Sequence, residues 1–173
     1  MTWLVPAKGP VRDQLLATID SLATEHDAPR FQPHLTLAPT FEATADAAAQ
    51  ALSSLIGDTP PVDVTFTAVG HERAYFRALY LAAEPSTQLT TLQEAARRTL
   101  APEPWHFTPH LSLLYSDISE APKHAIIDNI GIPLPLTTRF DAVELWARGD
   151  PEVRGWYRVA RVALAGLSQR EAR

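Results

Sequence analysis

The chain has 173 residues, of which 46% are hydrophobic and 20% are charged, and its net charge is −5. This length suits one domain with a sizeable buried core. Because cysteine is absent, disulfides, thiolate catalysis and zinc–thiolate sites are excluded. No signal-peptide pattern or apolar stretch of membrane-spanning length is visible, and the negative charge disfavours a general nucleic-acid binder. We therefore expect a cytoplasmic protein with no membrane partner. We also expect a monomer, although the sequence does not decide whether the chain self-associates.

Strands and helices are expected to alternate along the chain. Apolar residues at helical spacing indicate helices, and alternating apolar residues between proline or glycine breakers indicate strands. Strands are predicted at 3–5, 31–37, 62–69, 75–82, 107–115, 138–148 and 155–164, and helices at 11–26, 44–55, 85–100 and 120–130. This order is typical of an α+β fold. No glycine-rich loop follows a strand, which excludes P-loop and Rossmann sites.

One seven-residue motif occurs twice. Residues 31–37 read Phe-Gln-Pro-His-Leu-Thr-Leu and residues 107–113 read Phe-Thr-Pro-His-Leu-Ser-Leu. Both copies lie on predicted strands after a helix and a proline-containing loop. A duplicated half-domain explains this repeat. If the halves pack about a pseudo-twofold axis, the two strands meet and their polar side chains converge.

Within each copy, the histidine and the hydroxyl residue two positions later project to the same face of the strand. The four side chains are His34, Thr36, His110 and Ser112. A neutral imidazole can take a proton from water, a protonated one can protonate a leaving alkoxide, and hydroxyls can donate to phosphate oxygens. This set fits metal-free cleavage of a cyclic phosphodiester. A single strand histidine is more often structural, but two in the same frame favour catalysis, and no HExxH pattern supplies a third zinc ligand.

Paired His-x-Thr/Ser motifs resemble the signature of the two-histidine (2H) phosphoesterases, and the chain is most similar to the cyclic nucleotide phosphodiesterases of plants and yeast. The resemblance covers nearly the whole chain, including the opening Trp3-Leu-Val-Pro6, Arg30 before the first motif and Trp156 before the last apolar strand. It implies an α+β, bilobal, duplicated fold: one domain over residues 1–173, an antiparallel sheet with flanking helices in each lobe, and a cleft between pseudo-twofold-related lobes.

The resemblance also implies an activity. We expect metal-independent hydrolysis of nucleoside 2′,3′-cyclic phosphates to 2′-phosphates, or of ADP-ribose 1″,2″-cyclic phosphate, with no cofactor. His34 and His110 are then the catalytic pair, with His110 as the expected base and His34 as the acid. Thr36, Ser112 and Tyr115 are expected to contact the phosphate or the substrate. Tyr115 lies at an odd offset from His110, so it reaches the cleft only if the strand bends or ends there.

Other residues carry weaker signals. Tyr75 and Phe76 stand where plant members have phenylalanines, and on a strand they would point to opposite faces, so at most one would stack on a base. His71 lies in a predicted hairpin turn near the mouth of the cleft. His26 and His124 fall on predicted surface helices.

Two other functions stay open. The first is an RNA end-processing 2′,3′-cyclic phosphodiesterase or a 2′–5′ RNA ligase-like enzyme, whose partner would be a short RNA end. The acidic balance disfavours it, since the only tight basic pair is Arg97-Arg98, and it would show strong, salt-dependent RNA binding. The second is a non-catalytic module that binds cyclic nucleotides, which would bind its ligand and leave it unchanged.

Overall fold

The computed structural model describes residues 1–56, 58–101, 103, 105–149 and 153–165. Its strands are β1 (Thr2–Pro6), β2 (Leu35–Ala38), β3 (Val62–Gly70), β4 (Leu79–Ala83), β5 (His110–Leu114), β6 (Leu136–Arg148) and β7 (Trp156–Ala163). Its α-helices are α1 (Pro10–Glu25), α2 (Ala45–Ile56), α3 (Thr87–Leu100) and α4 (Glu120–Asn129), and two 3₁₀ turns lie at Tyr75–Arg77 and Val153–Gly155. The predicted α+β class is confirmed.

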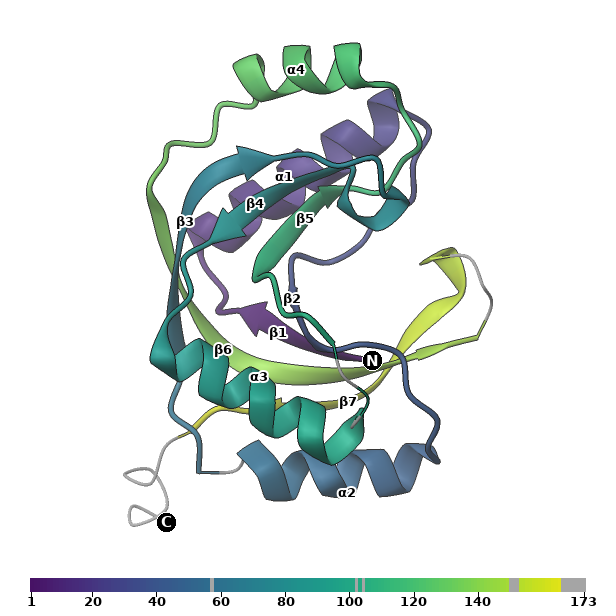
Figure 1. Ribbon diagram of the computed structural model, residues 1–173, viewed down its shortest axis with the longest axis vertical. Coiled ribbons are helices and arrows are strands. Elements are labelled where there is room, and N and C mark those ends of the chain that lie inside the picture. The colour runs from purple at the N-terminus through teal and green to yellow at the C-terminus, as the bar shows by residue number, and fades with distance from the viewer. Residues whose placement is uncertain (57, 102, 104, 150–152, 166–173) are drawn as a thin grey trace.

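The strands form one sheet in the order β1-β2-β5-β4-β3-β6-β7, in which β1 also pairs with β6 and every pairing is antiparallel. Strand β6 has 13 residues and curves along the molecule (Figure 1). Its first part pairs with β3, and its second part lies between β1 and β7. The expectation of a separate sheet in each lobe is therefore corrected, because β6 is long enough to belong to both ends of one continuous sheet. The duplicated, bilobal arrangement stays a prediction.

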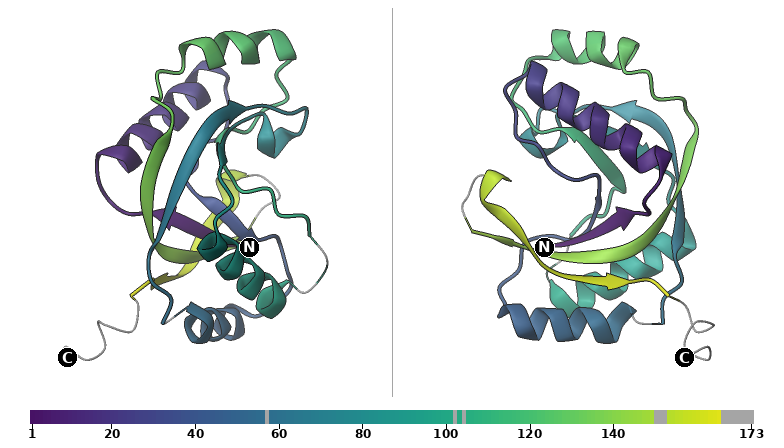
Figure 2. Two further views of the ribbon diagram at one scale, coloured as in Figure 1. Left: turned by 60° about the vertical axis from the view of Figure 1, so that its left-hand side comes forward. Right: turned by 180° about the vertical axis from the view of Figure 1, so that it is seen from behind.

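The helices gather in two pairs at opposite ends of the molecule, α1 with α4 and α2 with α3 (Figures 1 and 2). Helix α1, which precedes the first motif, packs on β5, and helix α3, which precedes the second, packs on β2. Each motif strand is thus covered by the helix that leads into the other motif. None of the helices in the described ranges is long and apolar enough to cross a membrane.

Three predicted strands are shorter than expected. The motif strands begin at Leu35 and His110, because the proline before each histidine has no N–H for a ladder bond. The predicted strand 75–82 begins as a 3₁₀ turn, and only Leu79–Ala83 is a strand. Hydrogen bonds from the Glu72 N–H to the Arg77 carbonyl (3.0 Å) and from the Arg77 N–H to the Ala74 carbonyl (2.9 Å) close that turn.

Truncating Leu111 to alanine should destabilise the fold strongly. This leucine has no exposed surface and lies where β2 meets β5, so the cavity left behind should cost about 2–5 kcal/mol. Urea unfolding would measure the loss, with Thr67→Ala on the exposed side of β3 as a control that should stay within about 0.5 kcal/mol of wild type. Equal effects of the two substitutions would contradict this packing.

Candidate active site

The register of β2 and β5 places the polar residues of both motifs on one face of the sheet. Leu35 lies opposite Leu111 in this antiparallel pair, and both leucines are fully buried. In an antiparallel pair, the residue that precedes one member lies opposite the residue that follows the other. His34 is therefore level with Ser112, and Thr36 with His110, on the face opposite the leucines. Ser112 is buried and Thr36 is half-buried.

Both histidines make the same hydrogen bond. His34 Nδ1 lies 2.6 Å from the Gln32 carbonyl, and His110 Nδ1 lies 2.7 Å from the Thr108 carbonyl. A carbonyl only accepts, so each Nδ1 carries the proton and donates it. The proline between each carbonyl and its histidine restrains the backbone at this position. Each neutral ring therefore has its lone pair on Nε2, the nitrogen left for a substrate or water.

His34 is held in a dry, aromatic environment. It is only 3% exposed, and the Trp3 ring stacks on it with centroids 3.7 Å apart and an interplanar angle of 11°. The pKa of His34 is lowered to about 3, mainly by burial and also by the positive charge of His110, although the Gln32 carbonyl acts in the opposite direction. The imidazole is therefore neutral in the free protein near neutral pH.

His110 is more accessible than His34 and lies among charged groups. The edge of the Tyr80 ring faces it at 5.3 Å, and the Arg77 guanidinium lies over that ring at 4.8 Å. Arg77 also pairs with Glu72 at 2.8 Å. Partial burial and the Arg77 charge lower the pKa of His110, while the Thr108 carbonyl and the Glu72 carboxylate act to raise it.

Tyr115 reaches the first histidine from the second motif. Strand β5 ends at Leu114, which is the condition under which the sequence allowed Tyr115 to enter the cleft. Its ring stacks on Phe31 at 3.9 Å, and its hydroxyl lies 3.4 Å from His34 Nε2. Burial raises the pKa of Tyr115 above its usual value. The phenol thus keeps its proton and can donate it to Nε2 or to a ligand oxygen.

The 3₁₀ turn places Tyr75 and Phe76 together, which corrects the expected alternation. Their rings lie 6.3 Å and 5.2 Å from the Tyr115 ring and are 36% and 45% exposed. The Ser112 hydroxyl donates to the Phe76 carbonyl at 2.9 Å, and the Ser116 N–H donates to the Tyr75 carbonyl at 3.0 Å. Since the residues are not on a strand, the argument that they point to opposite faces was wrong.

The sequence did not predict how the tryptophans are arranged beside the two motifs. Trp3 stacks on Trp146 as well as on His34, and Trp156 lies 5.9 Å from Phe76 with an interplanar angle of 28°. A pocket of about 350 Å³ beside His34 is lined by Trp3, Leu16, Asp20, Arg30, Phe31, Gln32, Trp146, Val153, Arg154 and Trp156. The position of Phe31 in the repeat could have indicated that it lies near the motif histidines. No sequence pattern indicates that Trp3 stacks on His34.

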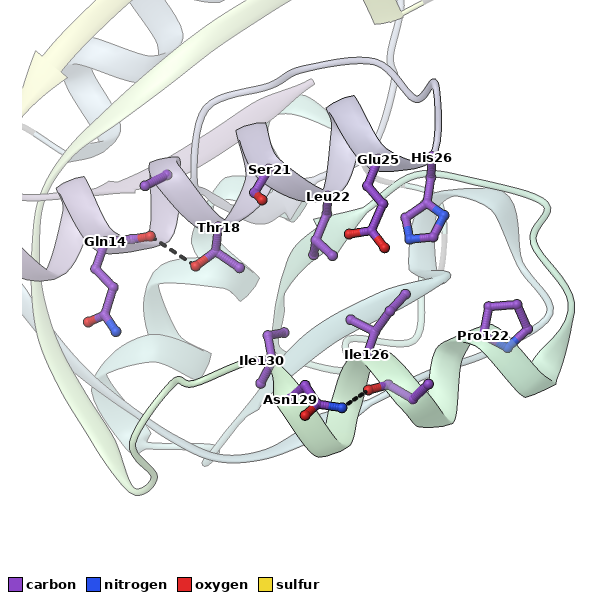
Figure 3. A pocket seen from close by; sticks show the side chains of 12 residues that line it. Gln14, Thr18, Ser21, Leu22, Glu25, His26, Pro122, Ile126, Asn129 and Ile130 are labelled. Atoms are coloured by element: carbon purple, nitrogen blue, oxygen red, sulfur yellow. Dashed lines mark hydrogen bonds between the residues drawn. The ribbon is translucent and has the colours of Figure 1, made fainter.

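A larger groove lies away from these residues. It has a volume of about 660 Å³ and runs between α1 and α4 (Figure 3), where Gln14, Thr18 and Glu25 face Ile126 and Asn129. Its walls contain no residue of either motif. This groove therefore lies apart from the two histidine motifs.

The sequence matches the 2′–5′ RNA ligase superfamily over residues 11–152. The chain belongs to this superfamily. A 2′,3′-cyclic-nucleotide 3′-phosphodiesterase of Eremothecium gossypii is 30% identical over 184 residues, which cover 87% of this chain and 84% of that protein. A cyclic phosphodiesterase of Arabidopsis thaliana is 27% identical over 110 residues, covering 61% and 59% of the two chains. The predicted resemblance to 2H phosphoesterases is confirmed.

Two solved structures of other proteins share the fold. E. coli LigT complexed with phosphate superimposes with a TM-score of 0.60 at 24% identity, and 95% of each chain is covered. TT0787 of Thermus thermophilus superimposes with a TM-score of 0.64 at 16% identity, covering 96% of this chain and 100% of that one. These structural likenesses support the α+β architecture with its antiparallel sheet.

The buried His34 should make the protein sensitive to acid. The pKa of this side chain is about 3 in the fold and about 6.5 in an unfolded chain. Below about pH 6.5 the unfolded chain therefore binds a proton that the folded one does not, and the free energy of unfolding falls by at most about 1.4 kcal/mol per pH unit. Urea titrations of wild type and His34→Asn at pH 7 and 4.5 would measure this.

We expect His34→Asn, which can still donate to the Gln32 carbonyl, to lose less stability than wild type between the two pH values. The exposed His106 gives a matched control, because His106→Asn should lose as much as wild type. An equal loss in all three proteins would show that His34 titrates normally.

Proposed function

We propose that this chain is a metal-independent hydrolase of cyclic phosphodiesters, with His34 and His110 as its general acid–base pair. The observation that carries the proposal is the duplicated hydrogen bond, which ties each Nδ1 to a backbone carbonyl and leaves each Nε2 for a substrate. Membership of the superfamily and the relatives named cyclic phosphodiesterases support the reaction class.

The reaction needs one neutral and one protonated imidazole. The neutral ring takes a proton from water, and the water oxygen forms a bond to phosphorus. The bond from phosphorus to the 3′ oxygen breaks, its electron pair goes to that oxygen, and the protonated ring supplies the proton. The product is a 2′-phosphate, and the proton taken from water remains on the first ring at the end of the turnover.

Substrate binding favours the protonated state. Burial lowers the pKa of both histidines in the free protein, so both rings are neutral near neutral pH. A phosphodiester carries a negative charge, and a nearby negative charge favours an imidazolium. Proton uptake therefore accompanies binding of the substrate, and this charge pairing holds the acid ready beside the leaving oxygen.

Thr36, Ser112 and Tyr115 are the proposed phosphate contacts. Two of them are level with a histidine of the other motif across the β2–β5 pair, and the Tyr115 hydroxyl lies beside His34 Nε2. Their O–H groups can donate to the non-bridging phosphate oxygens, where charge must be stabilised. Tyr75 and Phe76 offer partly exposed rings near Tyr115, which suits stacking with a base.

The favoured substrate is a nucleoside 2′,3′-cyclic phosphate that opens to the 2′-phosphate. The name of the Eremothecium gossypii relative states hydrolysis on the 3′ side of such a ring. ADP-ribose 1″,2″-cyclic phosphate presents the same five-membered cyclic diester and is the second proposed substrate.

A short RNA end with a 2′,3′-cyclic phosphate is a further candidate substrate, because the superfamily is named after 2′–5′ RNA ligases. The net charge of −5 argues against tight binding of a long RNA backbone. A module that binds cyclic nucleotides without cleaving them is a weaker candidate, since both histidines keep the same hydrogen-bonded geometry.

Hydrolysis of 2′,3′-cyclic AMP in excess EDTA tests the central proposal. Wild type should turn over, and His34→Ala and His110→Ala should each lose about 10²–10⁴-fold in rate, the typical contribution of a general acid or base. His106→Ala is the matched control and should keep the wild-type rate. Loss of wild-type turnover in EDTA, or activity indifferent to either motif histidine, would contradict the mechanism, and the product isomer identifies the bond that opens.

The pH dependence should also reflect both histidines. The base must be neutral and the acid protonated, so kcat/KM should rise and then fall with pH. Because both pKa values are lowered in the free protein, the maximum should lie below about pH 6.5, the ordinary histidine pKa. Removal of the general acid should abolish the fall of kcat/KM at high pH. Removal of the general base should abolish its rise at low pH. If the wild-type kcat/KM stayed constant from pH 5 to about pH 9, a range that includes ordinary histidine titration, the two histidines could not act as the general acid and base.

A further inference from the structure

Two histidines and a glutamate outside the catalytic motifs lie within metal-binding distance of one another. They are His71, in the segment that follows β3, and Glu120 and His124, on the first turns of α4. One potential ligand atom from each residue lies within 4.8 Å of the other two. Glu120 and His124 are four positions apart, so they share one face of the helix.

One ring nitrogen of His71 is buried and faces Glu120 without an aligned hydrogen bond. Its Nδ1 lies 2.9 Å from Glu120 Oε2, yet it is buried and makes no aligned hydrogen bond with any described residue. The edge of the His124 ring faces His71 with centroids 4.9 Å apart. A shared cation would satisfy all three groups, because a metal accepts lone pairs from imidazole and carboxylate alike.

The neighbours of Glu120 divide between its two carboxylate oxygens. Arg73 and Lys123 approach Oε1, at 3.6 Å and 3.5 Å, while His71 faces Oε2. Lys123 is buried and donates to the Glu72 carbonyl at 2.6 Å, so its position is fixed. The two cations orient the carboxylate as outer-shell partners of metal ligands do.

We propose that His71, Glu120 and His124 bind a zinc-type divalent cation that fastens the segment 71–77 to α4. Two imidazoles and a carboxylate are a ligand set that zinc takes in a tetrahedral arrangement with one position for water. Ligand atoms around such an ion are about 3.3 Å apart, as zinc–ligand bonds of about 2.0–2.1 Å require. The ligand atoms of the cluster, which lie within 4.8 Å of one another, would have to close to that spacing on binding.

The position of this site gives the cation a structural role. His71 begins the segment that carries Tyr75 and Phe76, and the Phe76 carbonyl accepts the hydrogen bond from Ser112. A cation held between His71 and α4 would fix that segment beside the catalytic face without touching either catalytic histidine. The cation would therefore make the segment with Tyr75 and Phe76 more rigid, and it would take no part in the proposed hydrolysis.

Zinc titration of the chelator-treated, dialysed protein tests this proposal. Calorimetry with Zn²⁺ should give one equivalent bound, and a thermal melt should show a higher Tm with the ion. His124→Ala changes an exposed side chain and should weaken binding by at least about tenfold, the lower end of what the loss of an outer-shell partner costs. His71→Ala should do the same, and Co²⁺ in place of Zn²⁺ should give a visible absorption band that both variants lose.

Two controls separate this site from the catalytic pair. The double variant His34→Ala/His110→Ala and the single variant His106→Ala should bind Zn²⁺ as wild type does. In EDTA, His124→Ala should hydrolyse 2′,3′-cyclic AMP at the wild-type rate, so a failure of the proposed hydrolase activity is told apart from a failure of metal binding. Absence of saturable one-to-one binding, wild-type affinity in His124→Ala, or loss of binding in the double variant would overturn the proposal.

Discussion

The single antiparallel contact between β2 and β5 is the constraint on which the arrangement of the two histidine motifs depends. Leu35 and Leu111 are opposite each other and fully buried, under helices α3 and α1. Because side chains alternate along a strand, a slip of one residue would turn a histidine into the core and a leucine out of it. Burial of the leucines therefore fixes the register, and the register brings together two motifs that are distant in sequence.

Local patterns predicted the elements better than their assembly. The helices and the motif strands follow from periodicity and proline positions, because these depend on neighbouring residues. The continuous sheet does not, since nothing within β6 indicates that its two parts take different partners. The 3₁₀ turn at Tyr75–Arg77 was missed because its aromatic residues favour strands, while the bonds between Glu72 and Arg77 and between Ser112 and Phe76 hold the turn.

The two motif histidines could be singled out from the sequence, but their environment could not. The repeat placed both histidines on one face, and its prolines anticipated a rigid backbone there. The Trp3 ring that buries His34 comes from a neighbouring strand, where Trp3 is paired with Thr36. Such a contact depends on register between strands, so it carries no local signature. That contact matters chemically, because burial is the main cause of the lowered pKa of His34.

Ser112 links β5 to the segment that precedes β4. A hydroxyl has one proton, so Ser112 cannot donate to the Phe76 carbonyl and to a phosphate oxygen at the same time. If it turns to the phosphate, the segment must be held by its other anchors, the Ser116 N–H on the Tyr75 carbonyl and Lys123 on the Glu72 carbonyl. Both anchors come from the chain that follows β5, so the second motif and its continuation into α4 support the segment with Tyr75 and Phe76 whichever way Ser112 donates.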